Sequence, residues 1–460
     1  MAYNFYGTDL EQMYLMPPSL KEWLPEGDLA RFLLDAVRQM DLGVFYEGYR
    51  EDGKGAPAYA PEMLVGLMLY AYCQGVRSSR TMERMSERDV AYRVMAGNMK
   101  PDHCTIARFR QGNEKKLERV FLEVLELCKE AGMVKVGMVA LDGTKMKANA
   151  SLEANRTKES LEKEIERMLK EAGEVDEEED RKYGKDKRGD ELPEGLRRSE
   201  ERLKRLRECK ERLEKEAKEA REAQERKIAQ REEKERESGE KLRGRKPLEP
   251  DEVVDEEAKA NITDPESRIM KTRQGHVQGY NAQAVVTKEQ IIVACRVTQE
   301  ENDTQQLKPM MELLRKNLVE IGVEEGVGHM LGDAGYGPTK VLEEVEGDQR
   351  TQYWINTQKD WKRRKALREE GPPRGRMPKG LDAKGRMERK LMTKEGRERY
   401  RWRCQMVEPV FGQTKHNRKC DGFQRRGIQA GDSEWVFICA THNLIKLWRS
   451  GKAPWVKKAA

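Results

Sequence analysis

The pattern of apolar and polar positions divides the chain into a helical beginning, a charged middle and a second half that contains strands. Over residues 1–135 apolar side chains recur at helical spacing, as at Leu29, Phe32 and Leu33. Pro61 suits the first position of a helix, and the segment after it, EMLVGLMLYAYCQG, is apolar on most sides. This helix is therefore expected at the centre of a small helical bundle.

Two shorter helical units follow, the first with Ser78 or Ser79 as its cap. A Gly97-Asn98 turn precedes the second unit. The first turns of that helix offer His103, Thr105, Arg108 and Arg110. Short helices, a turn and a helix with a polar beginning are typical of a helix-turn-helix, whose second helix enters the major groove of DNA. A helical bundle with a charged face is the alternative interpretation.

Strand-like sequence begins after residue 135. Apolar, β-prone runs predict strands at residues 136–141, 280–286, 291–297 and 353–356, with one more short strand directly before Asp333. The second and third form a β-hairpin, and a helix is expected from Thr304. This order predicts an α/β (α+β mixed) fold, with a mixed sheet flanked by helices and an all-helical N-terminal DNA-binding domain before it.

The expected domains follow from these patterns. The N-terminal domain takes residues 1–135, the catalytic domain residues 136–154 and 261–460, and a charged insertion residues 155–260. The insertion favours helix but buries little, so it is expected to be a helical hairpin that projects into solvent, serving either self-association or spacing. Residues 359–401 are rich in Lys, Arg, Gly and Pro, which predicts a flexible basic loop that binds DNA.

Composition sharpens this picture. The chain of 460 residues has 89 Lys and Arg against 83 Asp and Glu, a formal net charge of +6. Charged residues make up 37% and the mean hydropathy is −0.92, so some segments must be solvated. Acids crowd residues 160–180, whereas residues 359–426 are basic, and local basic surface is what a nucleic-acid partner requires.

Cysteine usage and the N-terminus indicate a cytoplasmic protein. The eight cysteines show no CxxC spacing, which predicts reduced thiols, and the spacing of Cys404, His416 and Cys420 fits no common zinc pattern. The N-terminal segment lacks a basic region followed by an apolar one, and no stretch approaches about 18 apolar residues. Neither secretion nor a membrane span is therefore expected.

Three acids are candidates for chemistry. Asp142 and Asp333 each follow a predicted strand, a common place for a metal ligand, although Asp142-Gly143 alone also makes a turn. Glu408 lies within the strongly basic residues 399–427, where a metal could take the acid and the basic groups the phosphates. An ordinary surface ion pair is the alternative for Glu408. Together the three acids could hold two Mg²⁺ ions for an in-line phosphoryl displacement.

Several segments resemble the bacterial insertion-sequence transposases of the DDE class, which have a ribonuclease H-like catalytic domain. They are SSRTMERMSERDVAYRVMAGNMKPDHCTIARFR, LDGTKMKANAS, GYNAQAVV, LGDAGYG and RYRWRCQMVEPVFGQTKHNRKCDGFQRRG. The last is the most specific, because it is similar to the Tyr/Arg/Glu/Lys signature of the family, here Tyr400, Arg403, Glu408 and Lys415. One residue more than in the usual form separates the arginine from the glutamate, so Arg401 is an alternative.

The resemblance implies roles for these residues. Asp142, Asp333 and Glu408 would be the catalytic triad and hold two Mg²⁺ or Mn²⁺ ions, while Arg403 and Lys415 would hold the phosphates beside the scissile bond. Tyr400 would belong to the same DNA-contacting signature. The family implies hydrolytic nicking at the element ends, followed by strand transfer by the freed 3′-OH.

The chain is thus predicted to be a DDE transposase. It would bind double-stranded DNA at terminal inverted repeats and at the target, act as a homo-oligomer with a dimer on DNA, and associate with the nucleoid. The alternatives are a catalytically inactive DNA-binding protein of transposase descent and a metal-dependent nuclease without strand transfer. A coiled-coil protein organised by residues 155–245 would leave the strand-end acids unexplained.

Overall fold

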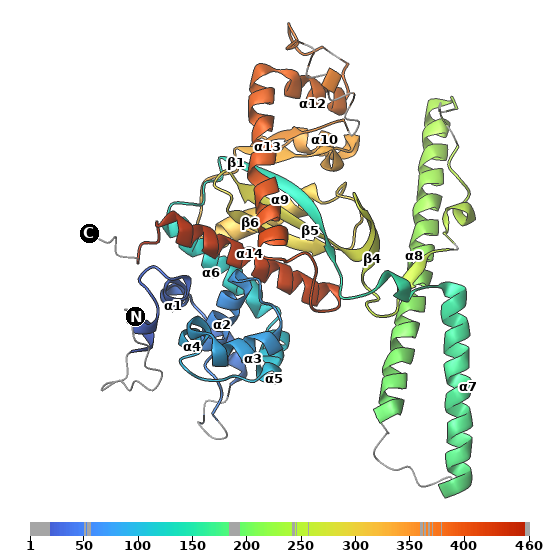
Figure 1. The fold of residues 1–460 in the computed structure, drawn as a ribbon. Coiled ribbons are helices and arrows are strands. Elements are labelled where there is room, and N and C mark those ends of the chain that lie inside the picture. Colours follow the sequence, from blue (N-terminus) through green and yellow to red (C-terminus); the bar gives the residue numbers. More distant parts are fainter. Residues whose placement is uncertain are drawn as a thin grey trace, which may run out of the picture.

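A computed structural model describes residues 19–455, apart from residues 50–51, 53–56, 184–193, 242–243, 245, 256 and several positions between 359 and 379. Figure 1 shows three parts: a group of N-terminal helices, a central sheet covered by further helices, and two long helices to one side. The sheet and the N-terminal helices share one continuous hydrophobic core, whereas the long helices have a small core of their own.

Helices α1 to α6 form the N-terminal part. Their bounds are α1 Leu29–Gln39, α2 Pro61–Cys73, α3 Ser79–Arg88, α4 Val90–Met95, α5 His103–Gly112 and α6 Lys116–Glu130, with short 3-10 helices at Leu20–Trp23 and Gly43–Gly48. Helix α2 is buried on nearly all sides and begins with Pro61, which confirms the predicted central helix. The Ser78 side chain accepts a hydrogen bond from the Thr81 amide and so caps α3, as its sequence favours.

The central sheet is mixed. Its strands are β1 Met138–Lys147, β4 Arg268–Thr272, β5 Gly275–Thr287, β6 Ile292–Thr298, β7 His329–Gly332 and β8 Gln352–Ile355. They lie in the order β4-β5-β1-β7-β8, and β6 also pairs with β5. Strand β1 is antiparallel to β5 and parallel to β7, which in turn is parallel to β8. The mixed α/β class and the β5–β6 hairpin are thereby confirmed.

The prediction that the first strand ends before Asp142 is wrong. Strand β1 continues through Asp142 to Lys147, because the long strand β5 pairs with it as far as Lys147 opposite Gly279. The parallel partner β7 stops much earlier, and its last pair with β1 is Leu331 opposite Ala140. Asp142 is therefore paired with β5 on one side of β1, whereas on the other side it lies beyond the end of the pairing with β7.

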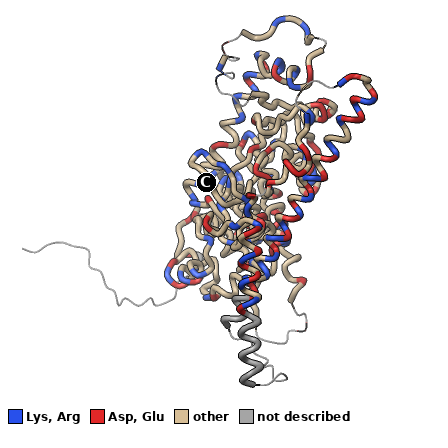
Figure 2. Tube along the Cα trace, turned by 90° about the vertical axis from the view of Figure 1, so that its right-hand side faces the viewer, with Lys and Arg blue, Asp and Glu red and all other residues tan. Residues whose placement is uncertain are grey.

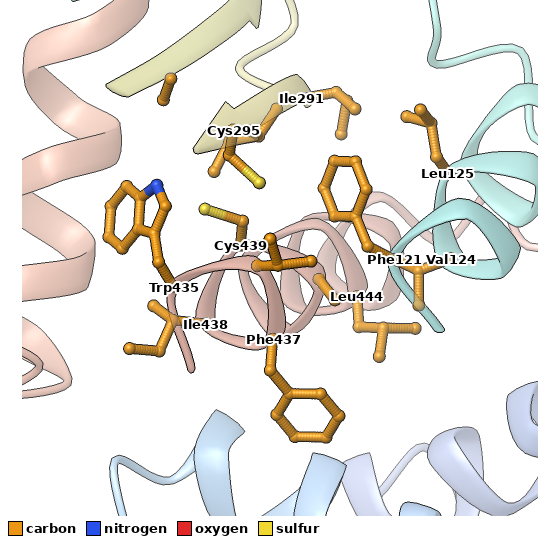
Figure 3. Close-up of a cluster of buried hydrophobic side chains, with 14 of the residues drawn as sticks. Phe121, Val124, Leu125, Ile291, Cys295, Trp435, Phe437, Ile438, Cys439 and Leu444 are labelled. Carbon is orange, nitrogen blue, oxygen red and sulfur yellow. The ribbon is translucent and has the colours of Figure 1, made fainter. Parts of the chain in front are cut away.

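Helices cover this sheet, and the last of them also contacts the N-terminal part. They are α9 Leu307–Glu320, α10 Thr339–Glu346, α12 Ala383–Met392, α13 Lys394–Gly412 and α14 Ile428–Ser450. Helix α14 packs against β6, α6 and α2. Figure 3 shows Cys439 of α14 pointing towards Cys295 of β6, and Phe437 pointing the opposite way, towards the N-terminal helices. The apolar helix α14 thus packs between the sheet and the N-terminal helices.

The predicted flexible loop at residues 359–401 is wrong in its second part. Helix α12 begins at Ala383 after the cap residue Asp382, and α13 begins at Lys394 after the cap residue Thr393. Because Ala383 and Met387 are buried, this basic segment contains enough apolar surface to pack against the sheet.

The insertion consists of two long helices and a two-stranded sheet, which lies at the start of the first helix and beside the middle of the second (Figure 1). Its elements are β2 Asn155–Thr157, α7 Lys158–Tyr183, α8 Glu194–Ser238 and β3 Lys259–Asn261, with β2 antiparallel to β3. Leu161, Leu206, Cys209 and Leu213 form most of its small core. Figure 2 shows Lys and Arg interspersed with Asp and Glu rather than separated onto two sides. Among the described helices, none has the length and apolar character needed to cross a bilayer.

Candidate active site

Asp142 and Asp333 occupy equivalent positions on neighbouring strands. The last pair between the parallel strands β1 and β7 is Ala140 opposite Leu331, and each aspartate lies two residues further along its chain. Parallel strands that pair are about 4.8 Å apart, so this register brings the two residues together at one edge of the sheet. The Asp142 carboxylate accepts from the Gly143 amide at 2.9 Å, and that of Asp333 from the Gly335 amide at 2.7 Å.

Arg403 joins these two carboxylates. Its Nη2 lies 2.7 Å from Asp142 Oδ2 and 3.8 Å from Asp333 Oδ2. The side chains of Arg403 and Asp142 are only 11% and 17% exposed, so water screens this ion pair little. Helix α13 contacts β1, β5, β7 and β8, which sets Arg403 over the edge where the aspartates meet. The alternative, Arg401, is exposed.

Burial raises the pKa of Asp142 to about 6, with Arg403 opposing this rise and Asp333 adding to it. Burial works against the charge on Arg403, but Asp142 and Asp333 outweigh it, and the pKa of Arg403 is raised. Both effects describe a place where negative charge is costly unless a cation is close.

Tyr400 and Lys415 lie on either side of Arg403. Burial raises the pKa of Tyr400 to about 12, and Asp333 adds to this rise, whereas Arg403 and a hydrogen bond with Asn356 oppose it. Lys415 belongs to a π-helical turn, Gln413–Asn417, that continues α13. Its ammonium group donates to Thr144 Oγ1 at 3.0 Å and to the Lys145 carbonyl at 2.8 Å, and burial lowers its pKa. Of the signature residues, Arg403 and Lys415 thus contact β1, and Tyr400 lies near Asp333.

Glu408 is the candidate that stands apart. It is exposed on α13, and its carboxylate hydrogen-bonds the Cys404 thiol. Burial and this hydrogen bond raise the pKa of Cys404. Within the part of the chain that the structure describes, no group of three His, Cys, Asp or Glu residues is arranged to hold a metal ion. The structure therefore brings together two of the three predicted acids.

The two aspartates nevertheless suit a divalent cation. Carboxylate oxygens are the ligands that Mg²⁺ and Mn²⁺ prefer, and both carboxylates already contact a single positive group, the guanidinium of Arg403. Asp142 and Asp333 could each supply an oxygen to an ion at this edge, whereas Glu408 would first have to turn towards it.

The N-terminal residues predicted to contact DNA have mixed surroundings. His103 pairs with Glu83 at 2.7 Å, and the Thr105 hydroxyl donates to Asp102 at 2.5 Å. Arg110 points inward and donates to the Tyr72 hydroxyl and the Arg77 carbonyl. Arg108 is exposed. Helix α5 thus presents Arg108 and its first turn to solvent, whereas Arg110 is engaged within the protein.

Sequence reasoning missed a polar group beside the two aspartates. Asp303 lies before α9, and it accepts hydrogen bonds from the carboxamides of Asn281 and Gln283 on β5. The available signal was two amide residues at alternate positions in an otherwise apolar strand, GYNAQAVV, because alternate positions share one face of a sheet. Nothing in the local sequence of Asp303 connects it to that strand.

Comparisons with known protein families match both ends of the chain. Residues 18–112 match a family described as Transposase domain (DUF772), and residues 377–448 match one described as Transposase DDE domain. The second match contains the signature residues Tyr400, Arg403, Glu408 and Lys415, whereas Asp142 and Asp333 lie outside both. No curated protein and no solved structure matches the chain. These two segments are thus similar to transposase domains, the second of the DDE class, and the similarity supports a transposase function and confirms the resemblance to the insertion-sequence DDE transposases.

Proposed function

We propose that this chain is a DDE transposase that cuts DNA strands at the ends of its element and joins the freed 3′ ends to target DNA. In this proposal Asp142, Asp333 and Glu408 hold two Mg²⁺ or Mn²⁺ ions. The bound metals would lower the pKa of an attacking water and offset charge on the leaving oxygen.

The observation that carries the proposal is the convergence of Asp142 and Asp333 on one cation. Two carboxylates at equivalent positions of neighbouring parallel strands repel each other unless positive charge lies between them, and here Arg403 supplies it. An ordinary structural ion pair would need only one of the two acids. A pair that shares one guanidinium is suited to exchange it for a metal.

The other residues would act on the DNA backbone. Once a metal is bound, Arg403 is free to leave the aspartates and pair with a phosphate beside the scissile bond, for which its planar fork is well suited. Lys415 is held against β1 by Thr144 and the Lys145 carbonyl, so its charge stays on the strand that carries Asp142, two to three residues further along. In the first step water attacks phosphorus and the 3′ oxygen leaves; in the second that 3′-OH attacks a target phosphate and displaces another 3′ oxygen.

The position of Glu408 favours an alternative function without catalysis. Because its carboxylate is exposed and paired with Cys404, a catalytically inactive DNA-binding protein of transposase descent is the second candidate. For the active enzyme, Glu408 must turn towards the aspartates when metal and DNA bind.

The N-terminal helices would recognise the element ends. We propose that α5 enters the major groove as the second helix of a helix-turn-helix, with His103, Thr105 and Arg108 nearest the bases. Arg110 would hold α5 in place rather than read DNA, because its guanidinium donates to Tyr72 and Arg77. A dimer would hold both ends together, and association with the nucleoid would follow from DNA binding.

Substitution of Asp333 by Asn tests the proposal. The assay incubates purified protein and Mg²⁺ with DNA that contains the flanks of the gene encoding this chain, and follows nicking and joining to a plasmid. Wild type is expected to nick and join, Asp333→Asn to do neither while binding the DNA equally well, and the exposed control Glu344→Gln to match wild type. If the wild-type protein nicks the DNA but does not join it, the chain is a metal-dependent nuclease. If the wild-type protein binds the DNA but does not nick it in the presence of Mg²⁺, the chain is the catalytically inactive DNA-binding protein.

A further inference from the structure

We propose that Asp303 is a positioning residue of this site, which holds the Asp333 loop in place through a buried relay of hydrogen bonds. The inference rests on the proposed function, because it concerns the geometry of the same cation site. It goes beyond that function by adding a residue outside the three acids and outside the Tyr/Arg/Glu/Lys signature.

The relay begins at the Asp303 carboxylate. Its Oδ1 accepts from Asn281 Nδ2 at 2.8 Å and from Gln283 Nε2 at 2.7 Å. Both amide side chains come from β5 and are fully buried. Asn281 also donates to the Glu300 carbonyl at 3.1 Å, which ties the segment before α9 to the same strand. Asp303 is thus fixed to β5 by two donors on neighbouring positions of one face.

Gln283 passes the constraint on to the Asp333 loop. The Tyr336 hydroxyl donates to Gln283 Oε1, and Tyr336 is fully buried. Burial, together with the charge of Asp303, raises the pKa of Tyr336 well above its usual range, so the hydroxyl keeps its proton and acts as the donor. The Gln283 amide must then turn its oxygen to Tyr336 and its nitrogen to Asp303. Each end of the relay fixes the other.

Tyr336 is three residues beyond Asp333 and ends the 3-10 turn Ala334–Tyr336. The Asp333 side chain caps this turn by accepting from the Gly335 amide. If the turn moved away from β5, the hydroxyl of Tyr336 and the side-chain oxygen of Gln283 would lose each other as partners, and leaving buried polar groups unpaired is unfavourable. The relay therefore fixes the position of Asp333 relative to strand β1, which carries Asp142 and pairs with β5.

Two glycines leave the space that the relay fills. A methyl group on Gly143, next to Asp142, would lie 2.3 Å from Gln283 Nε2 and 2.8 Å from Asp303 Oδ1. A methyl group on Gly335 would lie 2.9 Å from Asp333 Oδ1 and 3.3 Å from Asp303 Cβ. The backbones that carry both aspartates thus pack directly against the relay, and a change in Asp303 reaches both.

The test compares Asp303→Ala, which removes the acceptor, with Asp303→Asn, which keeps an oxygen at the same place for the two amides. The control is Glu301→Ala, an exposed acid two residues away. Free Mn²⁺ is titrated against each full-length protein without DNA and followed by electron paramagnetic resonance, and hydrogen exchange is measured at the amides of residues 333–337. Folding is checked by thermal unfolding.

Asp303→Ala is expected to weaken Mn²⁺ binding by about 10–100-fold, the range found for groups that orient metal ligands, and to speed exchange over residues 333–337. Asp303→Asn should stay within a few-fold of wild type in both measurements, and Glu301→Ala should match wild type. The proposal is overturned if Asp303→Ala binds Mn²⁺ normally. It is equally overturned if Asp303→Asn is as weak as Asp303→Ala, because the negative charge would then act and not the relay.

Tyr336→Phe keeps the inference testable if Asp303→Ala does not fold. It removes only the hydroxyl at the far end of the relay and should weaken Mn²⁺ binding in the same direction, by less than Asp303→Ala. An Asp333→Asn protein tested alongside separates the two proposals. If it binds Mn²⁺ as well as wild type, the proposed function fails, and the exchange data still decide whether Asp303 positions the loop.

Discussion

The active-site edge and the insertion hairpin use charge in opposite ways. At the edge a few charges are buried and share partners, with one guanidinium between Asp142 and Asp333. Along α7 and α8 many charges lie in solvent and pair with a residue one helical turn away, as Lys163 does with Glu159. The hairpin has far more charged residues, yet of these two regions, as far as the structure describes them, it is the edge that raises the pKa of an acid, Asp142, to about 6. Burial and convergence, rather than charge density, thus indicate the functional site.

Removing the cation at the active-site edge should have the largest effect. Arg403→Gln leaves Asp142 buried without its partner, and the loss of one member of a buried pair costs about 3–5 kcal/mol in the free energy of unfolding. Added Mn²⁺ should restore much of this loss, because it binds the folded state in place of the guanidinium. Urea unfolding with and without Mn²⁺ measures both effects, with the exposed Arg401→Gln as control. If Arg403→Gln were as stable as wild type, the ion pair between Arg403 and Asp142 would not contribute to the stability of the fold.

Gly143→Ala tests how tightly the edge is packed. The new methyl group would collide with Gln283 and Asp303, so we expect Mn²⁺ affinity to fall by about 10–100-fold. Gly137→Ala is the matched control, because a methyl group there meets nothing within 4 Å. Titration with Mn²⁺ compares the two variants, and similar affinities would mean that the edge tolerates displacement as readily as an open loop.

The buried acid at the edge and the exposed acids of the hairpin should also differ in their response to pH. Burial raises the pKa of Asp142 to about 6, and only the ionised carboxylate binds a metal. Mn²⁺ affinity should therefore be constant above pH 6 and fall by up to about tenfold per pH unit below it. In the hairpin the hydrogen bond from Lys163 lowers the pKa of Glu159, so that pair stays charged over the same range. A Mn²⁺ affinity that does not change between pH 5 and pH 7 contradicts this assignment.

Lys163→Gln should have the smallest effect. Both members of this pair are largely exposed, and exposed ion pairs contribute little because water and salt screen them. The melting temperature should stay within the scatter of replicate measurements, as should DNA nicking. A clear loss of stability would mean that the hairpin depends on its ion pairs more than its exposure indicates.

Much of the fold follows from local sequence. The β5–β6 hairpin, the strand before Asp333 and the apolar helix α14 are all visible as periodic patterns. The continuation of β1 through Asp142 is not, because it depends on a partner strand more than a hundred residues away. Helix α12 could not be predicted from the sequence, because its buried residues Ala383 and Met387 are too few to form a helical pattern in a basic segment.

The site shows the same division. Asp142, Asp333 and the signature on α13 could be found from strand ends and a family resemblance. The bridge from Arg403 and the relay from Asp303 to Tyr336 could not, since each joins side chains from separate elements. Spacing in one dimension carries no information on which of two neighbouring arginines faces the sheet; the packing of α13 against β1 decides it.

Anomalous scattering from crystals of the full-length protein soaked in Mn²⁺ would show whether the metal binds at the two aspartates. We expect a peak between the carboxylates of Asp142 and Asp333, with the Arg403 guanidinium displaced from both. Mn²⁺ bound only elsewhere, with Arg403 still bridging the two aspartates at high Mn²⁺ concentration, would contradict this expectation.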